Sequence, residues 1–171
     1  MVNCGLFYLV GCIKRLGMAF RGRYEYSLDP KGRLNIPAKF REIIVHDYNS
    51  ELVITTSIDG CLDCFPLAEW VKVEEKINAL PTSLEIKRFR RLYISGAVEC
   101  SLDKQGRILL PPSLRSWAGL DREVNNVVIA GQINRLELWS QERWNLETQA
   151  AVSSESTEKV TKLFKEIGLA I

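Results

Sequence analysis

The chain has 171 residues, of which 46% are hydrophobic and 26% are charged, and its formal net charge is +2. This composition predicts a globular protein of one domain or two small domains and excludes a disordered tail. A net charge so close to zero is not typical of a protein that coats nucleic acid or that anchors to a membrane through a polybasic segment.

The first 17 residues differ in character from those that follow. A short apolar run at residues 6–13 precedes Lys14 and Arg15, which is the reverse of the order in a secretory signal. The run is also too short to span a bilayer, and the chain has no apolar stretch of roughly 18 residues elsewhere. We therefore expect residues 1–17 to be an N-terminal extension, translated from an upstream start codon, and the folded chain to begin at Met18.

The first predicted elements form a strand, a tight turn, a second strand and a helix. Residues 24–28 read as a strand, and residues 29–32 as a turn, because proline fixes φ at the second turn position and glycine tolerates a positive φ at the fourth. Residues 33–36 read as the second strand. Pro37 suits the first position of a helix, where its missing N–H would have no partner anyway.

A hairpin and two helices are predicted next. Residues 52–58 are rich in β-branched side chains, Asp59-Gly60 is a strong hairpin signal, and residues 61–65 return as a strand. A helix then begins near Trp70 and continues to about Leu80. After a break at Pro81, residues 84–95 read as a further helix.

The second half of the chain repeats the first at a shift of 74 residues. The run SLDPKGRLNIP at residues 27–37 aligns with SLDKQGRILLP at 101–111, and the same shift continues without a gap to Trp70 and Trp144. Two copies are too few for a solenoid, which needs about three or more, so the pattern predicts a duplicated domain with a pseudo-two-fold axis. We expect repeats at residues 23–70 and 97–144, a helical connector at 71–95 and a C-terminal helical segment at 145–171.

The second copy is predicted to contain the same elements. Gly119 is a stop signal for its first helix, and residues 124–130 and 135–139 read as its hairpin strands. At the end of the chain, residues 156–167 carry an apolar face. The polar face of this segment mixes both signs of charge, which favours a packing or docking helix over a membrane-surface helix.

The cysteines and the single histidine argue against metal and disulfide chemistry. Five cysteines at irregular spacing do not form a disulfide framework, so we expect reduced thiols. Cys61 and Cys64 have the CxxC spacing of zinc and redox sites, but the usual second pair of ligands is missing. We interpret them as small strand residues, and we expect no metal and no cofactor. With only His46 available, a histidine-based triad is also disfavoured.

Each copy places an aspartate and an arginine four residues apart across a glycine-containing turn. The simplest interpretation is structural, because the carboxylate can accept N–H bonds within the turn and pair with the arginine. A duplicated turn also suits a partner with two-fold character. Duplex DNA is such a partner, since arginine reads guanine and basic side chains neutralise phosphates. The aspartate would then fix the arginine rotamer before binding. Both interpretations stay open from the residues alone.

Charge is distributed unevenly along the chain. Residues 14–41 carry eight basic and two acidic side chains, whereas residues 42–83 carry two basic and eight acidic ones. The near-zero net charge therefore hides a basic segment around the first turn. Residues 84–95 are also basic, which predicts either a solvated helix face or an interface with an acidic neighbour, such as the acidic segment of another subunit.

Several motifs resemble the MraZ family. They are Met-Ala-Phe-Arg-Gly at residues 18–22, the two Leu-Asp-x-x-Gly-Arg turns with their following prolines, and two Leu-x-x-Phe/Trp-x-x-x-x-Trp segments. The resemblance covers about residues 18–150. It implies an α+β fold of duplicated AbrB/MraZ-like swapped-hairpin β-barrel units with flanking helices and pseudo-two-fold symmetry.

The resemblance also implies a function. It implies a bacterial, cytoplasmic and nucleoid-associated DNA-binding regulator, which assembles into a ring. Such a regulator binds short direct repeats upstream of the division and cell-wall gene cluster, which includes its own gene. The DNA-binding residues it implies are Asp29, Lys31, Arg33, Asp103 and Arg107. Gln105 stands where the second turn would carry its lysine, so we expect that turn to bind phosphate more weakly.

An interaction protein and an enzyme are the two alternatives to a DNA-binding regulator. An AbrB-like antitoxin or interaction protein would use the C-terminal helix to wrap a partner. An enzyme is disfavoured, because the chain lacks a phosphate-binding glycine loop, a nucleophile elbow and a metal cluster. Asp29 and Asp103 could be paired acids only if protonated, and the arginine beside each would keep it ionised. We therefore expect no catalytic residue and no small-molecule substrate.

Overall fold

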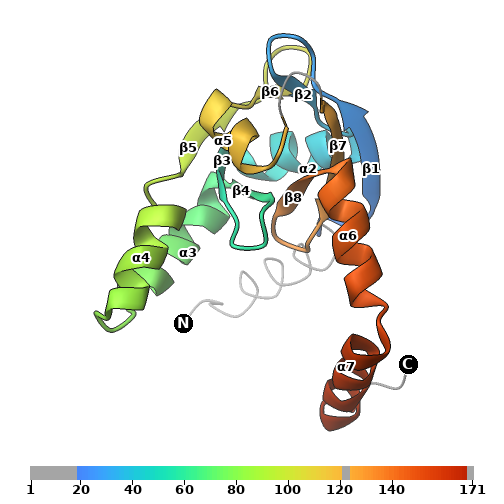
Figure 1. Ribbon diagram of the computed structural model, residues 1–171. Coiled ribbons are helices and arrows are strands. Elements are labelled where there is room, and N and C mark those ends of the chain that lie inside the picture. Colours follow the sequence, from blue (N-terminus) through green and yellow to red (C-terminus); the bar gives the residue numbers. More distant parts are fainter. Residues whose placement is uncertain (1–18, 121–123, 169–171) are drawn as a thin grey trace, which may run out of the picture. The chain divides into compact units, whose positions relative to one another are not determined.

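The computed structural model describes residues 19–120 and 124–168, and the chain divides into two compact units at Ser140. The expected extension at residues 1–17, with Cys4 and Cys12, lies outside the described residues. The larger unit contains, in chain order, β1 (Arg23–Ser27), β2 (Arg33–Asn35), α2 (Ala38–Tyr48), β3 (Glu51–Thr56), β4 (Leu62–Pro66), α3 (Leu67–Asn78), α4 (Leu84–Tyr93), β5 (Val98–Ser101), β6 (Arg107–Leu109), α5 (Pro112–Trp117), β7 (Asn126–Gly131) and β8 (Leu136–Ser140) (Figure 1). The smaller unit contains α6 (Gln141–Ala151) and α7 (Ser154–Glu166).

The larger unit is built on antiparallel strands, so the α+β class is confirmed. Six strands form one sheet in the order β1-β7-β8-β4-β3-β5, and β2 and β6 form a separate pair. The two hairpins, β3–β4 and β7–β8, meet through β4 and β8. Each hairpin then receives an edge strand from the other half of the chain, since β1 pairs with β7 and β5 pairs with β3.

The β2–β6 pair brings together positions that the 74-residue shift makes equivalent. Leu34 lies opposite Ile108, and the two backbone bonds that flank them, Ile36 N–H to Gly106 O and Leu110 N–H to Gly32 O, measure 3.1 and 2.9 Å. The turn before each strand therefore reaches the same end of the molecule, at the top of Figure 1. This pairing positions the candidate site.

The main core lies between the six-stranded sheet and the β2–β6 pair, with α2 and α5 closing it. Leu34 and Ile108 are buried at its centre, and Phe40 of α2 and Leu114 of α5 are buried with them. A second, smaller cluster fixes α3 and α4 against the other face of the β3–β4 hairpin. It contains Val53, Phe65, Trp70, Ile77 and Tyr93.

The predicted turns and hairpin are confirmed, with small corrections at their ends. Pro37 is not the first helical residue: α2 begins at Ala38, and Pro37 is the N-cap, with a ψ of 140°. The reason is that its carbonyl accepts the first helical hydrogen bonds, from Phe40 N and Arg41 N at 2.9 Å each. The first hairpin strand ends at Thr56 and not at Ile58, which is exposed on the turn.

The basic helix α4 is tied to the end of α3. Arg90 Nη2 donates to the carbonyl oxygens of Ile77 and Asn78 at 2.8 and 3.2 Å, at the C-terminal end of α3, where basic side chains can pair with the last carbonyls. Arg90 therefore has a structural role within the larger unit, which neither of the two expectations for the basic segment had included. Among the described helices, none is long and apolar enough to cross a membrane.

Cys61, directly before β4, and Cys64, within β4, are buried free thiols. Cys64 belongs to the main core, and burial raises the pKa of the Cys61 thiol to about 12, which keeps it protonated. Within the described part of the chain, no group of three or more His, Cys, Asp or Glu residues could hold a metal ion. Cys64 is therefore a small core residue of a strand, as expected, whereas Cys61 precedes the strand.

Two like charges face each other where the hairpins meet. Asp63 of β4 lies opposite Glu137 of β8, and both are buried. Arg135 bridges the two carboxylates and offsets part of their charge, with Nε 3.0 Å from Asp63 Oδ1 and Nη2 3.0 Å from Glu137 Oε1. Tyr93 OH donates to Asp63 and Trp139 Nε1 donates to Glu137, at 2.9 and 3.1 Å. Burial raises the pKa of Asp63 above its usual value, although Arg135 opposes this.

Replacing this arginine should destabilise the larger unit. We expect Arg135→Met to lower the free energy of unfolding at neutral pH by about 3 kcal/mol, because two facing carboxylates lose their counter-charge. Without Arg135 the pKa of Asp63 rises further, and an acid whose folded pKa is raised destabilises the fold as pH rises. The deficit should therefore shrink as pH falls, as measured by urea unfolding at several pH values. Arg88→Met, on an exposed site in α4, is the matched control, and equal stabilities of the two variants would contradict the assignment.

Candidate nucleic-acid interface

The two Asp–Arg turns have the same backbone geometry. In the first, Asp29 N–H bonds to Arg33 O at 2.9 Å and Gly32 N–H bonds to Asp29 O at 2.8 Å. In the second, the equivalent bonds join Asp103 to Arg107 at 2.8 Å and Gly106 to Asp103 at 2.9 Å. Gly32 and Gly106 have φ values of +79° and +74°, which side chains other than glycine rarely adopt. The turn predicted at residues 29–32 is therefore confirmed.

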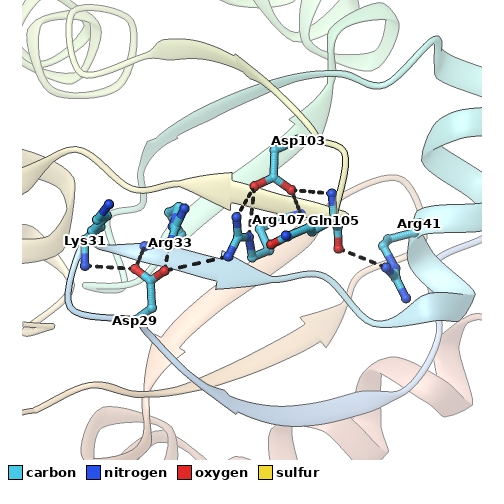
Figure 2. A network of polar contacts seen from close by, with 7 residues as sticks. All are labelled: Asp29, Lys31, Arg33, Arg41, Asp103, Gln105 and Arg107. Carbon is cyan, nitrogen blue, oxygen red and sulfur yellow. Dashed lines mark hydrogen bonds and ion pairs between the residues drawn. The ribbon is translucent and has the colours of Figure 1, made fainter.

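Each aspartate holds its turn with one carboxylate oxygen and its arginine with the other (Figure 2). Asp29 Oδ1 accepts from the backbone N–H groups of Lys31 and Arg33 at 2.9 Å each, and Oδ2 lies 2.5 Å from Arg33 Nε. Asp103 Oδ1 accepts from the backbone of Gln105 and Arg107, at 2.8 and 3.0 Å. Its Oδ2 accepts from Arg107 Nε and Nη2, at 2.9 and 2.7 Å. The arginines are thus oriented before any partner arrives.

These bonds keep both carboxylates ionised. The Arg33 backbone N–H, followed by its side chain, lowers the pKa of Asp29. The Arg107 side chain lowers the pKa of Asp103 to about 2. A carboxyl group that stays ionised at neutral pH cannot act as a general acid, so the geometry argues against a pair of catalytic aspartates here.

The turns lie side by side on one surface. Arg107 Nη1 lies 3.9 Å from Asp29 Oδ2, so the second arginine reaches across to the first carboxylate (Figure 2). Arg33 and Arg107 keep 33% and 21% of their side-chain surface exposed, and Lys31 is exposed on the rim. All five residues that the sequence singled out are therefore brought together, with two arginines accessible from one side.

Two further arginines support the turns and were not assigned a role from the sequence. Arg41 of α2 donates from Nη1 to Gln105 O in the second turn at 3.2 Å, and a Cβ on Gly106 would overlap its side chain. Arg115 of α5 packs against the first turn, where a Cβ on Gly32 would lie 3.1 Å from its Cζ and Nε. The 74-residue shift aligns Arg41 with Arg115, which is the signal that could have identified them.

Each turn is therefore packed by the helix that follows the opposite turn. Arg115 Nε is buried, and among the described residues it has no hydrogen-bond partner. Such a donor costs free energy unless an acceptor reaches it. The contact that the described residues give the Arg115 side chain is its packing over Gly32.

Comparisons with known proteins agree on one family. A family model described as "MraZ protein, putative antitoxin-like" matches two successive segments, residues 19–90 and 93–167. A protein of Carboxydothermus hydrogenoformans named "Transcriptional regulator MraZ" is 49% identical over 127 residues, covering 74% of this chain and 84% of the relative. Relatives of the same name from Pelotomaculum thermopropionicum and Halothermothrix orenii are 45% and 42% identical. They cover 84% and 88% of this chain, and 97% and 99% of their own lengths.

The second turn should contribute to stability in a pH-dependent way. A carboxyl group whose folded pKa is depressed stabilises the fold above its unfolded pKa, and this is lost as pH falls through the folded value. For Asp103 the window runs from its usual value of 3.8 down to about 2. We expect the thermal midpoint of Asp103→Asn to fall less than that of the parent across this window. Parallel curves for the two proteins would contradict the geometry.

Proposed function

Because the chain belongs to the MraZ family, we propose that it is a transcription regulator that binds duplex DNA through its paired Asp–Arg turns. The observation that carries the proposal is the pair of carboxylate-oriented arginines on one surface, at positions that the 74-residue shift relates. A duplex has its own local two-fold character, so two equivalent turns can engage equivalent groups on its two strands.

Preorientation favours recognition of DNA by these arginines. An arginine already fixed by a carboxylate loses less side-chain entropy on binding, and its planar fork matches guanine O6 and N7 or a phosphate. Among the described residues, the salt bridge of Arg33 uses only Nε, so both terminal nitrogens remain for DNA. Arg107 commits Nε and Nη2 to Asp103, and its Nη1 lies 3.9 Å from Asp29 Oδ2, so less of this guanidinium is available to DNA. We therefore assign the larger contribution to Arg33, with Lys31 contacting a phosphate nearby.

The fold is proposed to be a duplicated swapped-hairpin unit. Support comes from the two successive family-model matches, from the crossed pairing of β1 with β7 and β5 with β3, and from the equivalence of Leu34 and Ile108 across the β2–β6 pair. In this proposal the repeats are residues 23–70 and 97–144, joined by a connector at 71–95 and followed by a helical tail at 145–171. Residues 1–17 form the extension.

The wider regulatory role follows the family resemblance. We propose a homo-oligomeric ring that presents several turn pairs to short direct repeats upstream of the division and cell-wall gene cluster. Linked weak contacts gain affinity through effective concentration. Occupation of the promoter would exclude polymerase and repress the operon that contains the protein's own gene. Such a protein acts in the cytoplasm, in association with the nucleoid, without catalysis or a small-molecule substrate.

The alternative is an antitoxin-like or interaction protein. One observation favours it: Val160, Leu163 and Ile167, at the C-terminal end of the smaller unit, are exposed apolar side chains that could pack on a partner. Co-purification of a stoichiometric small protein with the full chain would support this alternative, whereas binding of the chain alone to its promoter supports the regulator.

The arginines provide the direct test. We expect Arg33→Ala to weaken binding to a duplex from the upstream region by about 10- to 100-fold, and Arg107→Ala by less, because each removes a positioned fork. Fluorescence anisotropy against promoter and scrambled duplexes at fixed salt measures both affinity and preference. Arg88→Ala, which removes one charge from exposed α4, is the control. If the double variant binds the promoter as the parent does, the site assignment is wrong.

A further inference from the structure

An open recess lies beside the second turn, between that turn and α2. It has a volume of about 620 Å³, and its charged lining includes Arg41 and Glu42 of α2 and Asp103 and Lys104 of the turn. Asp103 is already neutralised by Arg107, at 2.7 Å. The remaining charges are two cations and one exposed carboxylate, so the recess presents a net positive charge on the same side as the arginines.

Arg41 is held in this recess in a defined position. Its Nη1 donates to Gln105 O at 3.2 Å, and its side chain packs over Gly106 (Figure 2). A guanidinium has five N–H donors, and this carbonyl uses one of them. Lys104 is exposed on the adjacent turn, so its ammonium can move to meet an anion that approaches Arg41.

The corresponding place beside the first turn has different chemistry. At the 74-residue shift, Lys104 aligns with Pro30 and Gln105 aligns with Lys31, so each turn carries one lysine but at a different position. His46 at the far end of the recess aligns with Leu120, which is fully buried. Two residues that line the recess, Lys104 and His46, thus have no polar counterpart at the equivalent positions of the first half, and the recess lies where the sequence predicts a weaker phosphate contact.

We propose that this recess binds a backbone phosphate of duplex DNA through Lys104 and Arg41. The inference rests on the proposed function, because it adds a contact to the same DNA-binding surface. A phosphodiester oxygen is the fitting ligand, since lysine acts as a point charge and arginine donates charge-assisted hydrogen bonds to phosphate. The missing lysine at Gln105 is thus replaced by the lysine one position earlier, with a phosphate displaced toward α2.

The salt dependence of DNA binding tests this assignment. Each phosphate contact contributes about 0.9 to the slope of log K against log salt concentration for duplex DNA. We expect Lys104→Ala to flatten the slope by about one and to weaken promoter and scrambled duplexes by the same factor. Lys104→Arg should keep the parent's slope, because the charge stays at the same place. Lys76→Ala, on the exposed face of α3, removes the same charge elsewhere and should leave the slope unchanged.

The outcomes separate this inference from the proposed function. If Arg33→Ala and Arg107→Ala weaken binding but Lys104→Ala keeps the parent's slope, the recess is not a phosphate site and the regulator proposal stands. If the arginine variants have no effect, the proposed function fails, whatever Lys104 does. Inorganic phosphate at constant ionic strength should leave the parent's DNA affinity unchanged. Saturable competition that disappears in Lys104→Ala would assign the recess to a free anion and overturn its assignment to the DNA backbone.

Discussion

One constraint shapes the larger unit: in two strand pairs, residues that the 74-residue shift makes equivalent lie directly opposite each other. Leu34 lies opposite Ile108 in the β2–β6 pair, and Asp63 lies opposite Glu137 in the β4–β8 pair. The first meeting is favourable, because two buried apolar side chains pack in the main core. The second is unfavourable, because like charges directly opposite on a sheet repel. Arg135 offsets that repulsion, and its own equivalent position is occupied by Cys61. One arginine therefore serves both halves, and the symmetry is broken at this point.

The same constraint brings the two turns together. Strands β2 and β6 pair antiparallel about Leu34 and Ile108. The glycine carbonyl of each turn therefore accepts a backbone hydrogen bond from the other half: Gly32 O from Leu110 N–H, and Gly106 O from Ile36 N–H. Arg41 and Arg115 reinforce this arrangement by packing over those glycines from the opposite helices. A change in the conformation of one turn therefore alters the packing of the helix that belongs to the other half. The surface that carries the turns is better described as one unit of two turns and two helices than as two independent motifs.

The turns, the hairpin and the repeat could be predicted from the sequence, because each is encoded by residues that are close together or that recur at a fixed shift. The turn at residues 29–32 is encoded by Pro30 and Gly32, the hairpin by Asp59-Gly60, and the repeat by direct comparison of the two halves. The crossed strand pairing could not be derived from residues alone, since a duplicated sequence is equally consistent with two self-contained halves. The role of Arg135 was missed for two reasons. Asp63 is distant in the sequence, and Glu137, although only two residues away, lies in a segment that reads as an ordinary strand.

The two turns are equivalent in backbone but not in electrostatics. Arg107 shares its charge between Asp103 and, at 3.9 Å, Asp29, whereas Arg33 pairs, among the described residues, with Asp29 alone. The first turn adds Lys31 to a more available arginine, and the second adds Lys104 beside a more heavily committed one. Under the proposed function, a duplex that engages both turns would meet a base-reading arginine on one side and a denser backbone contact on the other. A surface of that kind would have a preferred direction along DNA, which suits direct repeats better than palindromes, because every site in a direct repeat points the same way.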